Sequence, residues 1–151
     1  MDKNDILESC TNVIREADTA YLATLDGKGF PQVRAMLNLK FEDQFPGLAE
    51  FLKKNAKGFE TYFTTNTSSR KIQQIKINPG VSVYYNVGYN GVTINGNIEL
   101  IEDKSVKDVV WQDGWELYYP KGINDPDYAV LKFTPKALSL FSSLKVHEVE
   151  L

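Results

Sequence analysis

Short strand-like segments recur along most of the chain and are separated by tight turns. They are rich in β-branched and aromatic residues, and several alternate apolar with polar residues, as in strands of a sheet with one buried face. The expected strands lie at about residues 20–25, 31–39, 59–65, 81–87, 92–101, 128–134 and 138–144. Five to seven strands with few helices favour a mainly β fold, a small antiparallel barrel rather than a doubly wound sheet.

A few helices are expected between these strands. Apolar residues from Ile6 to Ala17 recur at helical spacing and place Cys10 on the buried side, as a core residue rather than a nucleophile. Residues 40–58 form a polar excursion with a short helical pattern and no recognisable chemistry. Asp103 can cap a helix that runs to about Trp111. His147, the only histidine, lies in a polar tail and is expected to be solvated.

Composition limits the class of protein. A length of 151 residues predicts a single domain, residues 1–151. The net charge of -3 offers no basic surplus for a nucleic-acid backbone, so nucleic acid is not expected as a partner. No apolar run reaches membrane-spanning length, and the polar N-terminus lacks a signal-peptide core. One cysteine fits a reducing compartment, so a cytoplasmic location is expected.

Residues 62–79 combine a strand end, a loop and a helix start. Ser68 or Ser69 can cap the helix, which ends at Asn78-Pro79. The first turn carries Arg70 and Lys71, although a cation there usually costs about 0.3 to 1 kcal/mol. Hydroxyls, free N–H groups and two cations at one place would suit a phosphate. The alternative is a polar turn whose cations point into water.

Arg34 is a second unexplained cation. It lies with Met36 on one face of an otherwise apolar strand, and burying an unpaired charge is costly. It can pair with a carboxylate, lie on an exposed strand face or reach an anionic ligand.

The expected strand at 92–101 contains a glycine in its middle. Gly96 there indicates a bulge or a close approach by another backbone or a ligand.

Several kinds of chemistry lack their sequence patterns. One histidine and one cysteine cannot build a structural zinc site, so no metal site is expected. The chain has no nucleophile elbow, Walker-type phosphate loop, dinucleotide glycine fingerprint or carboxylate pair suited to glycoside hydrolysis. If the protein is an enzyme, an organic cofactor is expected to carry the chemistry, and no catalytic side chain is assigned.

The order and spacing of several motifs resemble the pyridoxamine 5′-phosphate oxidase-like family of FMN-binding split barrels. The resemblance covers about residues 5–135 and is nearest to the short bacterial members called general stress protein 26-like. The motifs are, in order, Ala23-Thr24-Leu25-Asp26-Gly27, Val33-Arg34-Ala35-Met36, Phe63-Thr64-Thr65, Ser69-Arg70-Lys71, Asn78-Pro79, Val81-Ser82-Val83-Tyr84, Ile94-Asn95-Gly96 with Glu99-Leu100, and Asp125-Pro126-Asp127-Tyr128.

The resemblance implies an antiparallel Greek-key split β-barrel that forms a homodimer, with FMN bound at the subunit interface. It also implies a flavin-dependent oxidoreductase that acts on a small-molecule substrate or electron donor. Its implied FMN contacts are Arg34 at the phosphate or ribityl chain, Ala35 and Met36 beside the ring, Thr64 and Thr65 along ring and ribityl chain, and Ser69, Arg70 and Lys71 at the phosphate. The proposed partner-side wall comprises Gly91, Asn95, Trp111 and Trp115.

The chain also departs from the family pattern. True pyridoxamine phosphate oxidases grip the substrate phosphate with arginine and histidine near the C-terminus, whereas Ser142 to Leu151 contains no arginine. Vitamin B6 oxidation is therefore not expected. The alternatives are a split barrel that uses a deazaflavin or haem, a non-catalytic FMN-binding, stress-response or redox-sensing module, and a ligand-free dimeric barrel. For the aromatic cluster around Trp111 and Trp115, core or subunit interface is preferred over a ligand border.

Overall fold

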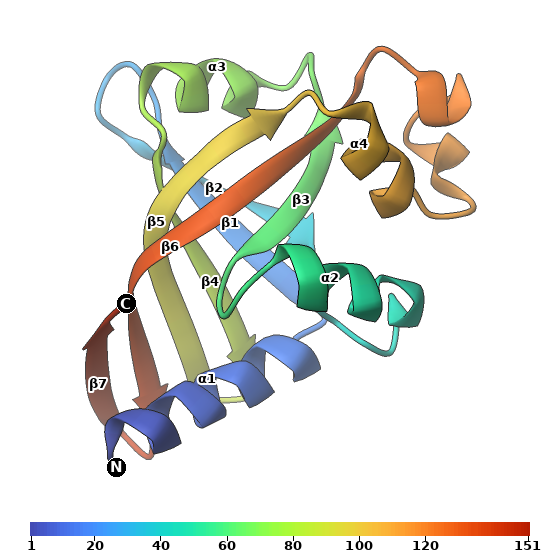
Figure 1. Ribbon diagram of the computed structural model, residues 1–151. Helices are drawn as coiled ribbons and strands as arrows, with labels where there is room; N and C mark the ends of the chain where they lie inside the picture. The colour runs from blue at the N-terminus through green and yellow to red at the C-terminus, as the bar shows by residue number, and fades with distance from the viewer.

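Seven antiparallel strands form one strongly curved sheet in the computed structural model, which describes residues 1–151 (Figure 1). The strands are β1 (Thr19–Leu25), β2 (Pro31–Leu37), β3 (Thr61–Asn66), β4 (Gly80–Val87), β5 (Asn90–Ile101), β6 (Tyr128–Ser142) and β7 (Lys145–Glu150). Their order is β2-β1-β4-β5-β6-β3, and β7 pairs with β6. No hydrogen-bonded register joins β2 to β3, so the sheet stays open between them. The predicted antiparallel split barrel is confirmed.

Helices cover the ends and one side of this sheet. They are α1 (Lys3–Glu16), α2 (Ala49–Asn55), α3 (Arg70–Ile77) and α4 (Lys104–Val110), with short 3-10 turns at Pro46–Leu48, Trp115–Leu117 and Gly122–Asn124. The predicted first helix is α1, which begins with a capping box between Asp2 and Asp5 and crosses one end of the barrel (Figure 1). α3 lies at the opposite end, where β3 finishes. None of the helices has the length and apolar character needed to span a membrane.

Two apolar clusters hold the fold together. The larger fills the barrel under α1 and α3 and includes the fully buried Cys10. Burial raises the pKa of the Cys10 thiol to about 11, so the thiol stays protonated and acts as a core residue, as expected. The smaller cluster lies between α2, α4 and the outer side of β3 and β6. Its buried members are Leu39, Phe45, Leu48, Leu52, Ala56, Tyr62, Val110, Trp115, Tyr119, Tyr128 and Val130.

The C-terminal part differs from the sequence-based expectation. Residues 128–134 and 138–144 were expected to form two strands, but β6 runs unbroken from Tyr128 to Ser142. Pro135 is tolerated inside it because Pro135 lies at a register shift opposite Gly96, where regular pairing is interrupted. The expected polar tail forms β7, whose His147 lies opposite Leu140. The tail therefore forms a strand instead of an irregular end, because its alternating residues pair with an available strand edge, and His147 in it is half-buried.

Gly96 occupies the predicted bulge. A Cβ atom at this position would collide with the Thr134 carbonyl oxygen and would lie 2.9 Å from the Phe133 ring. The backbone oxygen cannot move away without disturbing the β5–β6 pairing. The expected bulge and the close approach of another backbone are therefore both confirmed.

We predict that Gly96→Ala lowers the free energy of unfolding by about 1–3 kcal/mol, because an overpacked position must shift its neighbours. Urea denaturation measures this change. Gly27→Ala is the matched control, since a Cβ at Gly27 meets no atom within 4 Å and the expected change is below about 0.5 kcal/mol. Equal stabilities of the two variants would contradict the steric role of Gly96.

Candidate functional site

Three cations converge where β2, the end of β3 and the start of α3 meet. We call Arg34, Arg70 and Lys71 the cation cluster. Burial lowers the pKa of Arg34, and the charge of Arg70 lowers it further. Burial also lowers the pKa of Lys71, with a second contribution from Arg34. The three positive charges therefore act on one another, although they come from strands and helices that are separate in sequence.

Neutral acceptors hold the Arg34 guanidinium in place. One of its terminal nitrogens (Nη1) donates to the Leu22 carbonyl oxygen at 3.2 Å and to Thr24 Oγ1 at 2.8 Å. The other (Nη2) donates to Gln74 Oε1 of α3 at 3.3 Å. Nε donates to no protein acceptor, so donor capacity remains. Thr24 belongs to one of the family motifs but had no role assigned from the sequence, and Gln74 had none either, because both roles depend on the contact between β1 and α3.

Lys71 lies against two hydroxyls of the predicted site. Its Nζ donates to Thr65 Oγ1 and to Ser69 Oγ, both at 2.8 Å. Ser69 occupies the N-cap position of α3, but its hydroxyl makes no capping hydrogen bond. The predicted helix start is confirmed, whereas the predicted side-chain cap is not, because the serine hydroxyl accepts from Lys71 instead. The site thus combines cations, hydroxyls and the start of a helix.

No carboxylate neutralises the cation cluster. The structure has four ion pairs within 4.0 Å, and none of them includes Arg34, Arg70 or Lys71. Like charges in a partly buried place repel each other, and a bound anion would relieve that repulsion. For Arg34, this excludes the carboxylate pairing that the sequence left open. The cluster has the chemistry of a phosphate site: fixed cations, N–H donors and hydroxyl groups.

Asp127 shapes the loop that leads into α3. Its carboxylate accepts hydrogen bonds from Asn66 Nδ2 at 2.6 Å, Thr67 Oγ1 at 2.7 Å and the Ser68 backbone N–H at 2.9 Å. These hydrogen bonds lower the pKa of Asp127 to about 2, and the bond from the Thr67 hydroxyl has the largest effect. The residue precedes β6, so its position beside the β3–α3 loop follows from the β3–β6 pairing. From the sequence, Asp127 was known only as part of the Asp125-Pro126-Asp127-Tyr128 motif, and its contact with this loop was not predicted.

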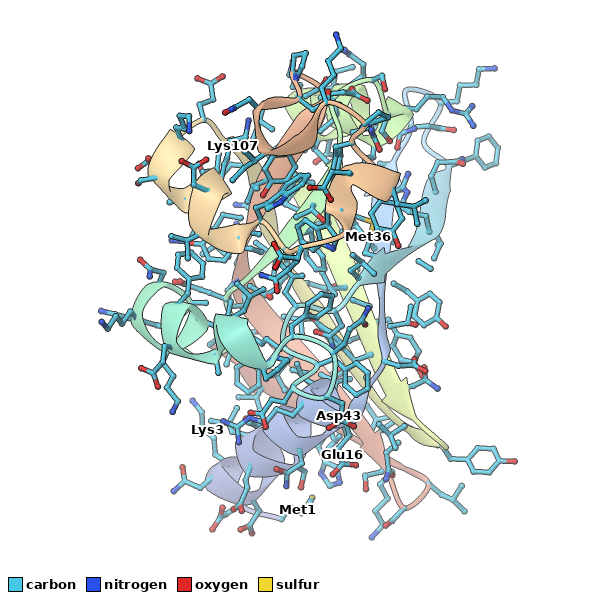
Figure 2. The ribbon with its side chains drawn as sticks, turned by 90° about the vertical axis from the view of Figure 1, so that its right-hand side faces the viewer. Met1, Lys3, Glu16, Met36, Asp43 and Lys107 are labelled. Atoms are coloured by element: carbon cyan, nitrogen blue, oxygen red, sulfur yellow. The ribbon has the colours of Figure 1, made fainter.

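The residues expected along the flavin ring lie close to the cation cluster in the fold. Met36 lies two positions after Arg34 on β2 and is buried, while the intervening Ala35 is exposed on the other face. In Figure 2, Met36 lies in the body of the molecule, between the α4 segment that carries Lys107 and the end of α1. Thr64 is half-buried on β3 beside the Tyr119 hydroxyl. Their contact with a flavin stays a prediction.

The four residues proposed for a partner-side wall do not join the cation cluster within one chain. Gly91 and Asn95 lie on the outward face of β5, where Asn95 Oδ1 accepts from Ser82 Oγ at 2.6 Å and the Tyr84 ring covers Gly91. Trp111 and Trp115 belong to the smaller apolar cluster, with ring centroids 5.9 Å apart. Trp115 is buried within its own chain. This agrees with the expectation that the aromatic cluster belongs to the core or a subunit interface.

We predict that Asp127 supports stability above about pH 4 and that this contribution is lost toward pH 2. The pKa of Asp127 in the folded state, about 2, is below the unfolded value of about 3.9, so protonation favours unfolding. The difference in Tm between wild type and Asp127→Asn should be largest at pH 5 and shrink by pH 2. Asp43→Asn is the control, because Asp43 is exposed and forms no hydrogen bond or ion pair through its side chain. A difference that is independent of pH would contradict this role.

Known proteins share this fold and this sequence pattern. Residues 6–142 match the family described as "Pyridoxamine 5′-phosphate oxidase". A crystal structure of a protein from Clostridium acetobutylicum, related to general stress protein 26 of B. subtilis in the pyridoxinephosphate oxidase family, has 27% sequence identity and a TM-score of 0.80, and the match covers 100% of this chain and 97% of that one. No curated protein matches the chain by sequence.

More distant structures share the fold alone. General stress protein 26 from Bacillus anthracis has 21% identity and a TM-score of 0.72, over 96% of this chain and 98% of that one. A heme-binding protein from Mycobacterium smegmatis has 12% identity and a TM-score of 0.67, over 99% of this chain and 60% of that one. The match over residues 6–142 confirms the resemblance seen in the sequence: this chain belongs to the pyridoxamine 5′-phosphate oxidase family.

Proposed function

We propose that this protein binds FMN and that the cation cluster holds the FMN phosphate. The observation that carries the proposal is the absence of any carboxylate partner for Arg34, Arg70 and Lys71. A phosphate dianion would supply the missing negative charge and accept from the free donors of Arg34. Membership in the family adds support, because the resemblance assigns these three residues to the phosphate.

The side chains have separate tasks in this proposal. Arg34, Arg70 and Lys71 bind the phosphate, and the Ser69 and Thr65 hydroxyls keep the Lys71 ammonium in position. Gln74 fixes the Arg34 guanidinium, and Met36 offers an apolar contact for the ring. Bound FMN would supply hydride or electron exchange with a substrate, and the chain would orient the ring and limit its exposure to water. No side chain is assigned as an acid or base.

The outer face of the sheet supports the homodimer. Ala35, Tyr21 and Tyr84 are paired across β2, β1 and β4, and all three point outward. Val33 lies on the same face and is 66% exposed. Gly91 and Asn95 share this outward face, so a second copy packed here would bring its own Gly91 and Asn95 to the interface. An exposed apolar sheet face of this kind is typical of a subunit interface.

Other cofactors and a non-catalytic role are the rivals. The heme-binding structure from Mycobacterium smegmatis shares the fold, but the single histidine of this chain lies on β7, paired opposite Leu140 and outside the cation cluster. The cation cluster therefore contains no histidine that could ligate a haem iron. Competition with a deazaflavin cofactor tests the choice of flavin. Turnover with nicotinamide donors and varied acceptors separates an oxidoreductase from a flavin-binding or redox-sensing module.

We predict that Arg70→Glu combined with Lys71→Glu weakens FMN binding at least 100-fold, because two attractive charges become repulsive. Quenching of flavin fluorescence on titration measures the affinity, and circular dichroism checks the fold. The matched control is Lys76→Glu, which reverses an exposed charge in the last turn of the same helix. FMN affinity that is unchanged by the double reversal would refute the phosphate site.

We also predict that Val33→Asp with Tyr84→Asp converts a dimer to a monomer, since buried unpaired carboxylates oppose association. Light scattering coupled to size exclusion measures the molar mass. Leu117→Asp is the control, because Leu117 is 82% exposed and lies in the turn after α4, outside this face. A double variant that keeps the mass of two chains would place the interface elsewhere.

A further inference from the structure

A cavity separate from the cation cluster lies between α1, the β2–α2 connection and α2. Its volume is about 260 Å³, and half of its lining residues are apolar. The apolar lining comprises Ile14, Leu39, Phe45, Ala49, Leu52, Ala56 and Phe59. In Figure 2, α1 and α2 face the viewer on this side, with Glu16 and Asp43 nearby at the end of α1 and in the β2–α2 connection. The excursion at residues 40–58, in which the sequence showed no chemistry, supplies most of this lining.

Positive charge dominates the polar part of the cavity. Arg15, Lys40, Lys53 and Lys57 line it, with Glu42 as the single carboxylate. This excess contrasts with the net charge of -3 of the chain. An apolar chamber bordered by cations suits a molecule that has an apolar body and a negative head group.

Lys40 and Lys57 are the two cations of the cavity without a carboxylate within 4.0 Å, and of these two only Lys40 is partly buried. Arg15 pairs with Glu42 at 3.6 Å, and Lys53 lies 3.9 Å from Glu50. Lys40 Nζ instead donates to the Gly58 carbonyl oxygen at 3.0 Å, which leaves two of its three N–H donors for another acceptor. Lys57 is exposed at the rim. One half-buried ammonium next to an apolar chamber matches a monoanion better than a dianion.

The electrostatic environment of Lys40 agrees with this geometry. Burial lowers the pKa of the Lys40 ammonium to about 8, while the Glu60 carboxylate opposes the shift and Arg15 adds to it. Glu60 forms an ion pair with Lys132 at 3.7 Å and none with Lys40. A buried ammonium with a lowered pKa is stabilised when an anion binds beside it.

We propose that this cavity binds a small monocarboxylic acid with a short apolar chain. The carboxylate would accept from the Lys40 ammonium, and the chain would lie against Leu39, Leu52 and Phe59. The cavity is slightly smaller than the roughly 300–1,000 Å³ of sites for drug-sized ligands, which favours a short chain. The site is independent of FMN, so its ligand does not bear on the phosphate site.

Titration of the full-length protein with octanoate tests this site, with 1-octanol as the uncharged probe of equal chain length. We expect octanoate to bind, octanol to bind at least tenfold more weakly, and Lys40→Met to weaken octanoate at least tenfold, as loss of a charged hydrogen bond implies. The matched control is Lys54→Met, which removes an exposed charge of α2 that does not line the cavity. Its octanoate affinity should stay within about twofold of wild type, an order-of-magnitude bound on the loss of one exposed charge.

A second variant tests whether the apolar chain of the ligand lies inside the cavity. Ala49→Leu enlarges a half-buried residue of the lining, should fill the cavity and should abolish octanoate binding, while thermal unfolding and circular dichroism stay close to wild type. Octanoate that fails to bind wild type, or binds Lys40→Met equally well, would overturn the proposal. Octanol that binds as tightly as octanoate, or octanoate that still binds Ala49→Leu, would overturn it as well.

Discussion

Repulsion among three neighbouring cations, of which Arg34 and Lys71 are partly buried and Arg70 is exposed, is the constraint on which this end of the barrel depends. Arg34 comes from β2, and Arg70 and Lys71 come from α3, yet burial and their mutual charge lower the pKa of Arg34 and Lys71 together. Neutral oxygens hold two of these side chains without removing their charge. The Asp127 carboxylate also lies at this end, but it accepts hydrogen bonds from the loop at residues 66–68 and forms no ion pair with the cations. The arrangement keeps the cations close while leaving their charge for a ligand.

The fold supplies the geometry for this arrangement. β1 places Leu22 and Thr24 against Arg34, and the pairing of β3 with β6 brings Asp127 to the loop before α3. Gly96 lets β5 and β6 approach each other at the bulge, which keeps the long β6 strand in the sheet. The opposite end, under α1 and α2, carries the separate cationic cavity. The fold thus carries two positively charged sites, the cation cluster and the cavity lined by Lys40, on a chain of net charge -3.

Local patterns predicted much of the fold. Alternation and turn residues located six of the seven strands, and the motif at Ser69-Arg70-Lys71 located the start of α3. The missed features depend on long-range pairing: β7 needs the edge of β6, and Thr24, Gln74 and Asp127 act only through partners distant in sequence. The cavity around Lys40 was missed for the same reason, because α1 and α2 form it jointly. Local sequence periodicity does not report contacts between residues that are distant in sequence.

Comparison of FMN with riboflavin tests the phosphate site most directly, because the two ligands share the ring and ribityl chain and differ in the phosphate. Titration of the purified, flavin-free protein with each, followed by flavin absorbance and fluorescence, gives both affinities and the number of sites per chain. The cation cluster predicts one FMN per chain and an affinity for FMN at least about 100-fold above that for riboflavin, as several charged hydrogen bonds imply. Equal affinities, or no binding of FMN, would contradict the assignment of Arg34, Arg70 and Lys71 to a phosphate.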